Sequence, residues 1–267
     1  MRVRHVLFIL VLTAILFFLS GCQSPVVDSP VPDTPILSPT ASLGNTLSPT
    51  ETPIPTLQPS PSADPAEVQL KLLYQSSLKY LAKTDEQAWE VAKSLGYAPL
   101  GGYPSNMCGP LAVSILKDSG ILGPDVDLHD FWLLDPSVDN VLLQTVFPTN
   151  HFEWLHNDLP INEIDYKQFP LKAGDMVYIY SGYQGDYSHV LTVTRVDEDG
   201  RAYSVTNNYT AQGFVVLEYM LYDPAHPGEG IFYDWPDPAN RGLGLTGFGG
   251  MDVWRPISLP YYAGTNQ

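Results

Sequence analysis

The sequence predicts an α+β domain with helices in its first part and an antiparallel sheet in its second. Between residues 66 and 120, apolar side chains recur at helical spacing. From residue 175 onward, runs rich in β-branched and aromatic residues alternate with turn signals, which is typical of strands. Helices followed by an antiparallel meander form an α+β arrangement. We assign residues 66–267 to this single domain, which at about 200 residues can bury a substantial core.

Three helices are expected, and capping signals mark the first two. Residues 64–67, DPAE, combine an N-cap, a proline at the first helical position and an acid, and they open EVQLKLLYQSSLKYLAK. Thr84 and Gln87 repeat the capping pattern before AWEVAKSLGY, in which Gly96 is a C-terminal stop. A third helix should run from about Cys108 to about residue 120, because GPLAVSIL is an apolar run.

Strands are expected in the second half of the domain. Residues 121–170 hold many Asp, Asn and Pro, so we expect loops there, with short helices such as LHDFWLL. Residues 197–200, DEDG, mark a turn, and the glycines of GLGLTGFGG are interpreted as turn and tight-packing positions. The predicted strands are DMVYIYS, HVLTVTRV, AYSVTNN, FVVLEYMLY (one strand or a pair) and MDVWRPI.

The N-terminus has the features of an export signal. Arg2 and Arg4 precede an apolar run too short for a comfortable membrane span, which fits a signal peptide over residues 1–21. The residues LSGC, ending at Cys22, resemble a bacterial lipobox, in which the cysteine is acylated and becomes the mature N-terminus. An uncleaved N-terminal anchor with a coincidental cysteine is the alternative. Either interpretation predicts an extracytoplasmic protein held at the bacterial cell envelope, through lipid on Cys22 in the first case.

Residues 22–65 are predicted to form a tether between the lipidated cysteine and the domain. After Cys22 this segment is rich in Pro, Ser and Thr and contains no Lys, Arg or aromatic residue. It cannot bury enough apolar surface to fold, and its prolines favour extended polyproline II geometry.

Charge and spacing argue against several classes of partner. The formal charge is −16, and removing the signal peptide with Arg2 and Arg4 leaves −18. Such acidity disfavours binding to nucleic acid or to an anionic lipid surface. His151 and His156 are five residues apart, unlike the i, i+4 spacing of zinc motifs, and no glycine-rich phosphate loop follows a strand. We therefore predict no metal and no cofactor.

Cys108 is the candidate nucleophile. The chain has two cysteines, so lipid on Cys22 leaves Cys108 without an intramolecular partner. It lies at the start of the third predicted helix, where the macrodipole and unpaired N–H groups favour a thiolate. The alternative is a small buried hydrophobe.

His189 is the candidate general base. Of the six histidines, His5 lies in the signal peptide and four others lie in polar or proline-rich loop segments. His189 instead opens the strand HVLTVTRV, where the ladder fixes its backbone and its side chain can face a cleft. A cysteine at a helix start with a histidine on a later strand suits Cys–His nucleophilic catalysis.

Several segments resemble the papain-like cysteine hydrolases. MCGPLAVSIL looks like the nucleophile segment of peptidase family C39-like proteins, which carry Cys-Gly-Pro before an apolar helix. LKAGDMVYIY and SHVLTVTRVDEDGRAYSVTNN are similar to the Gly-Asp strand, His strand and turn of CHAP and NlpC/P60 type cell-wall hydrolases. The resemblance covers roughly residues 100–210 in pieces. It implies a papain-like fold, with Cys108 as nucleophile and His189 as general base.

The same resemblance implies a third, orienting residue and an oxyanion donor. Asn207 on the strand after the His strand is the expected orienter, with Asn208 in its place if a bulge shifts the alternation. C39-like proteins generally carry Asp there, and a turn-forming Asn pair is the alternative. The Cys108 backbone N–H can serve the oxyanion, but the upstream Gln common in the superfamily is missing. Asn106 or Tyr103 could substitute, although Asn106 could equally be an N-cap.

Two functions from different classes follow. The first is an envelope-anchored cysteine hydrolase that cleaves amide bonds in a peptide, a protein or the peptide stem of the cell wall. The second is a non-enzymatic papain-like module that binds peptide or glycan. Retention of Cys108 and His189 favours the first function, and the missing Gln favours the second.

Overall fold

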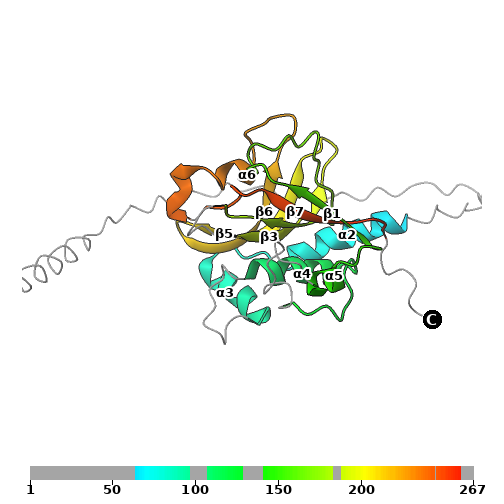
Figure 1. Ribbon diagram of the computed structural model, residues 1–267. Helices are drawn as coiled ribbons and strands as arrows, with labels where there is room; N and C mark the ends of the chain where they lie inside the picture. Colours follow the sequence, from blue (N-terminus) through cyan, green and yellow to red (C-terminus); the bar gives the residue numbers. More distant parts are fainter. Residues whose placement is uncertain (1–63, 97–106, 129–140, 183–187, 244, 260–267) are drawn as a thin grey trace, which may run out of the picture. The chain divides into compact units, whose positions relative to one another are not determined.

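The computed structural model describes residues 64–96, 107–128, 141–182, 188–243 and 245–259 (Figure 1). The chain divides into two units, residues 1–58 and 59–267, and all described residues belong to the second unit. The predicted signal peptide, Cys22, most of the tether and most of the LHDFWLL segment lie outside the described residues. Among the described helices, none is long and apolar enough to cross a bilayer.

The described domain consists of helices and two antiparallel sheets, which confirms the predicted α+β class. The helices are α2 (Pro65–Leu78), α3 (Asp85–Ser94), α4 (Cys108–Asp118), α5 (Val141–Val146), α6 (Ile231–Asp234) and the 3-10 helix η4 (Pro238–Leu243). The strands are β1 (Phe152–Asn157), β2 (Met176–Ile179), β3 (His189–Thr192), β4 (Arg195–Val196), β5 (Ala202–Thr210), β6 (Gly213–Tyr222) and β7 (Met251–Pro256).

The predicted helix starts are confirmed, and one predicted helix is too long. The Asp64 side chain accepts from the Ala66 N–H, and the Thr84 side chain accepts from the Gln87 N–H. The first helix ends at residue 78 rather than near residue 83, because Ala82 exchanges two 2.8 Å backbone hydrogen bonds with β6. Pairing with a distant strand thus ends the helical stretch early.

The strands form two sheets with the orders β1-β7-β2-β3 and β4-β5-β6. The segment HVLTVTRV, expected as one strand, divides into β3 and β4 because its hydrogen-bonding partner changes. The Val193 N–H donates to Asp175 O, whereas the Thr194 N–H donates to Tyr203 O in β5. The chain therefore passes from one sheet to the other between these two residues.

The first sheet differs from the expected meander in its strand order and in one additional strand. β1 lies in the region predicted as loops, and β7, the last strand of the chain, inserts between β1 and β2. Gly250 enters β7 at φ +81°, where an added Cβ would lie 2.1 Å from Asn157 O. This close approach confirms the tight packing predicted for the glycine-rich segment. FVVLEYMLY forms the single strand β6.

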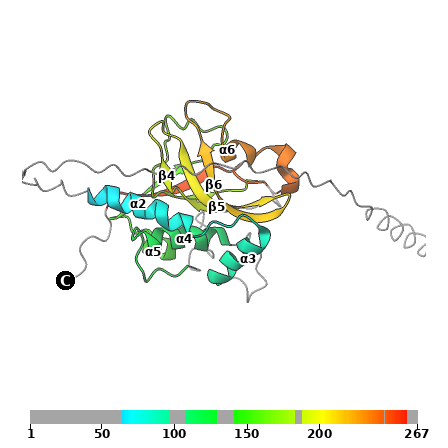
Figure 2. The same cartoon turned by 180° about the vertical axis from the view of Figure 1, so that it is seen from behind.

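Helices cover both faces of the sheets. Figures 1 and 2 show α2, α3, α4 and α5 on one face and α6 on the opposite face. One apolar core joins α2, α3 and α4 to strand residues such as Val190 and Val205. A second core contains Leu191, Phe232 and Trp235 and includes α6.

Candidate active site

Cys108 is the first residue of α4, the most deeply buried helix of the described domain. Every residue from Cys108 to Leu116 is buried, and α4 packs against β3. Met107 is the N-cap, and its side chain makes no capping hydrogen bond to the N–H groups of the first turn. Pro110 lies in that turn, where its missing N–H has no intrahelical partner to lose.

The Cys108 thiol is held in its neutral form. Its pKa is raised above the ordinary value of 9.0, chiefly because burial penalises the thiolate. The backbone N–H groups of Val190 and Gly109 are directed at the sulfur and lower the pKa only in part. The N–H groups of the helix start favour the thiolate as expected, but burial has the larger effect, so the net shift is opposite to the expected one.

His189 opens β3 and is only 3% exposed. Its Nε2 lies 2.9 Å from Thr206 Oγ1, and its ring packs edge-on against the Trp235 indole at a centroid distance of 4.9 Å. Burial lowers the pKa of His189 from 6.5 to about 3. The imidazole is therefore neutral at physiological pH, with its orientation fixed by a hydroxyl and an indole.

Thr206 is the orienting partner that sequence reasoning missed. Alternation along β5 places Thr206 and Asn208 on one face and Asn207 on the other. Asn207 is buried, and its predicted orienting role stays a prediction. The available signal was Thr206 itself, a hydroxyl residue directly before the Asn pair and on the opposite face from Asn207.

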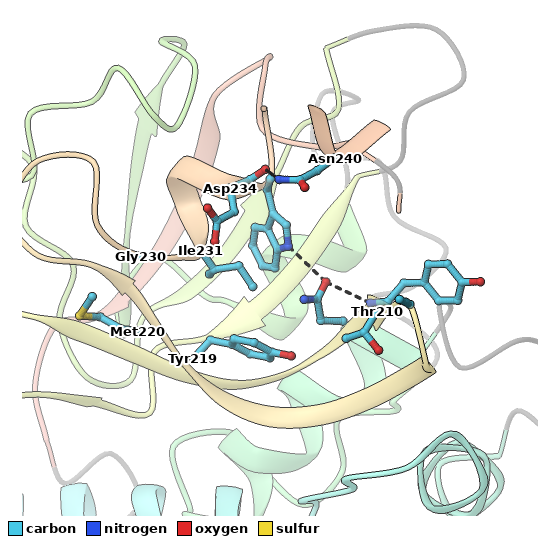
Figure 3. Close-up of a pocket in the computed structure, with 11 residues that line it drawn as sticks. Thr210, Tyr219, Met220, Gly230, Ile231, Asp234 and Asn240 are labelled. Carbon is cyan, nitrogen blue, oxygen red and sulfur yellow. Dashed lines mark hydrogen bonds between the residues drawn. The ribbon is translucent and has the colours of Figure 1, made fainter. Parts of the chain in front are cut away.

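Asn208 supports the site indirectly. Its Oδ1 accepts a 3.3 Å hydrogen bond from Trp235 Nε1, drawn as a dashed line in Figure 3. Because the same indole packs against His189, Asn208 holds the aromatic ring that shields the imidazole. Tyr103 and Asn106, the oxyanion candidates, lie outside the described residues.

The thiol and the imidazole lie on neighbouring elements. The Val190 N–H that is directed at the Cys108 sulfur belongs to the residue next to His189. Within the described ranges, no hydrogen bond joins the sulfur to the His189 ring. The structure thus brings α4 and the start of β3 together, and the catalytic pairing of the two side chains stays a prediction.

Two other histidines have carboxylate partners. His156 Nδ1 lies 2.7 Å from Asp252, and His226 Nδ1 lies 3.0 Å from Asp223. The hydrogen bond that His226 donates to the Asp223 carboxylate raises the pKa of His226. In the described part of the chain, Asp223, His226 and Glu229 also form a group whose possible metal-ligating atoms lie within 4.8 Å of one another. Their hydrogen bonds fold the turn between β6 and α6, which accounts for their proximity.

A pocket of about 460 Å³ adjoins the His189 site. It lies between β5 and β6 on one side and α6 with η4 on the other (Figure 3). Trp235 and Asn208 line it, so the side chains that shield and support the imidazole also form a pocket wall.

Comparison with known proteins found no family model, curated protein or solved structure that matches this chain.

Proposed function

We propose that this domain is a papain-like cysteine hydrolase that cleaves amide bonds, in peptides or in the peptide stem of the cell wall. One observation carries the proposal. The His189 ring is fixed by Thr206 and Trp235 at the first residue of β3, and the second residue of that strand contacts the Cys108 sulfur. This places the thiol-bearing helix start beside the strand start that carries the imidazole, which supports the proposal because Cys–His catalysis needs the two side chains to come within hydrogen-bond reach.

The proposed reaction has two stages. His189 Nε2–H donates to the Thr206 hydroxyl, which leaves Nδ1 to accept the thiol proton as Cys108 Sγ bonds to the substrate carbonyl carbon. The C–N bond then breaks, and the imidazolium returns the proton to the leaving amine. Water, deprotonated by His189, attacks the thioester and releases the acid and the thiol. The Cys108 backbone N–H donates to the oxyanion, a role in which Asn106 and Tyr103 stay candidates.

The neutral resting state sets the mechanism. Burial raises the pKa of the Cys108 thiol above its ordinary value and lowers the pKa of His189 to about 3, so proton transfer from the thiol to the imidazole is strongly unfavourable at rest. A thiolate–imidazolium pair is therefore not populated at rest, and His189 takes the proton as the sulfur attacks. This unfavourable transfer adds to the barrier of the chemical step, so slow turnover is expected.

Acyl transfer from p-nitrophenyl acetate tests the proposal. The expected result is a burst of p-nitrophenol, an acetyl group located on Cys108 by mass spectrometry, and slow release of acetate. His189→Ala should slow acylation by about 10²-fold or more, because a general base is lost. His156→Ala is the matched control and should leave the rate unchanged, because this exposed histidine lies against Asp252 instead. Acylation only in denaturant, or equal rates in both variants, would refute the hydrolase.

A binding module is the second candidate function. Cys108 is only 8% exposed and, like His189, is neutral, which is the state of an inert buried pair. The acylation assay separates the two functions, since a binding module would retain its thiol unmodified in the folded state.

We also propose that lipid on Cys22 anchors the chain to the bacterial envelope. The lipobox-like LSGC and the Pro/Ser/Thr-rich tether support this proposal. A chain expressed in bacteria should incorporate labelled palmitate and partition into detergent, whereas Cys22→Ser should do neither. Equal labelling of both chains would refute the anchor.

A further inference from the structure

The pocket beside His189 has a distinct chemical character. Its walls carry three aromatic side chains, Tyr209, Tyr219 and Trp235. They also carry hydrogen-bond acceptors, foremost the carboxylate of Asp234 and the amide of Asn240. Figure 3 shows Asp234 and Asn240 on the α6 and η4 side, across the pocket from Tyr219 on β6. Among the described residues that line the pocket there is no Lys, Arg or His.

The Asp234 carboxylate is available to a ligand. Asp234 is exposed, and within the described ranges no ion pair or side-chain hydrogen bond uses its carboxylate. The Asn240 Nδ2 group donates to the backbone oxygen of Asp234 at 2.8 Å, which directs the amide nitrogen toward the chain and leaves its oxygen as an acceptor. One negative charge, further acceptors and aromatic rings therefore border the same cavity.

We infer that this pocket binds the basic side chain, arginine or lysine, of a peptide. A cation is attracted both by a carboxylate and by the faces of aromatic rings. A guanidinium additionally stacks on such rings and offers five N–H donors to a wall rich in acceptors. The cavity volume of about 460 Å³ accommodates either side chain.

The pocket shares the Trp235 wall with the His189 site, so binding of a basic side chain there would help to select the substrate. Trp235 forms part of the pocket wall and packs against His189, so a side chain held there extends from a peptide that passes the imidazole. A basic residue would then be selected close to the bond that is cut. This role as a substrate-selecting pocket rests on the proposed hydrolase, whereas the binding itself does not.

Calorimetry on the full chain carrying Cys108→Ala tests the inference without any turnover. The probes are acetyl-Ala-Arg-Ala-amide and its citrulline counterpart, which keeps the shape of arginine and removes the charge. The arginine peptide should bind at least tenfold more tightly than the citrulline peptide. Asp234→Asn should abolish this preference. Asp158→Asn, which removes one exposed carboxylate that lines no part of the pocket, should preserve it.

Each other outcome overturns the inference. Equal affinity for the two peptides, binding of neither peptide, or a preference that survives Asp234→Asn would each exclude a cation pocket. Because Cys108 is absent from every protein in the titration, failure of the hydrolase proposal leaves these results unchanged. Failure of the pocket proposal likewise leaves the acetylation of Cys108 untouched.

Discussion

Replacing His189 by glutamine should make the domain less sensitive to acid. The pKa of His189 is about 3 in the folded chain and 6.5 when unperturbed, so between these values the unfolded chain binds more protons. Folding stability contributed by the neutral ring is present above pH 6.5 and is lost as the pH falls toward 3. Linkage gives a loss of about 2 kcal/mol in the free energy of unfolding between pH 7 and pH 5.

Urea denaturation at pH 7 and at pH 5, monitored by tryptophan fluorescence, measures this loss. Glutamine retains a nitrogen that can reach Thr206 but does not titrate. The difference between the two pH values should therefore be about 2 kcal/mol smaller in His189→Gln than in the parent chain. All other titrating groups, including His226 with its raised pKa, contribute equally to both proteins and cancel.

Equal losses of stability in the two proteins between pH 7 and pH 5 would refute this prediction. That result would mean that the imidazole is solvated well enough to accept a proton in the folded state.

Three further predictions test the structure around the site. Thr206→Val should lower the rate of acyl transfer to Cys108 by about tenfold or more, because the hydroxyl that positions His189 is lost. Thr206→Ser should restore both this rate and the parental pH–rate profile. An equal loss of rate in the two variants would contradict a positioning hydroxyl. Gly230→Ala should lower the free energy of unfolding by more than about 2 kcal/mol, because φ is +113° and the new Cβ would lie 2.4 Å from a backbone oxygen of β6. An unchanged midpoint of urea denaturation would contradict this prediction. Arg255→Met should lower the free energy of unfolding by about 3–5 kcal/mol, because it leaves the fully buried Asp175 carboxylate without its ion-pair partner. A decrease below about 1 kcal/mol would show that the ion pair is solvated.

Local signals in the sequence were sufficient for the helix starts. Asp64 and Thr84 cap their helices through contacts to residues two or three positions away. The turn before Gly200 is equally local, with the Gly200 N–H donating to Asp197 O at 3.0 Å. Such contacts depend on neighbouring residues alone, which is why a pattern of a few letters predicts them.

Features decided by distant parts of the chain could not be predicted. The end of α2 depends on the pairing of Ala82 with β6, and the division of HVLTVTRV depends on a change of partner strand at Thr194. Likewise, the paired residues of β1 and β7 lie about a hundred positions apart in the sequence. No local pattern contains the partner in these cases.

In the candidate site, too, the features set by neighbouring residues could be predicted, and those set by distant parts of the chain could not. The helix start at Cys108 and the strand start at His189 are consequences of local patterns, and both are where the sequence placed them. The protonation states are not local, because the pKa values of both side chains are set by burial beneath elements that the sequence could not position. Thr206 was missed for a related reason, since the face of β5 that meets His189 depends on how the two sheets join.

Trp235 links recognition to proton transfer in this arrangement. Trp235 is 5% exposed and lines the pocket, and its indole packs against the His189 ring while Asn208 accepts a hydrogen bond from its Nε1. Burial is the cause of the low pKa of His189, and the indole supplies part of that burial. A peptide side chain that occupies the pocket would cover the indole from the other side and keep water from the imidazole. The imidazole would therefore stay neutral when a substrate is in place, and it would take the thiol proton only as the sulfur attacks.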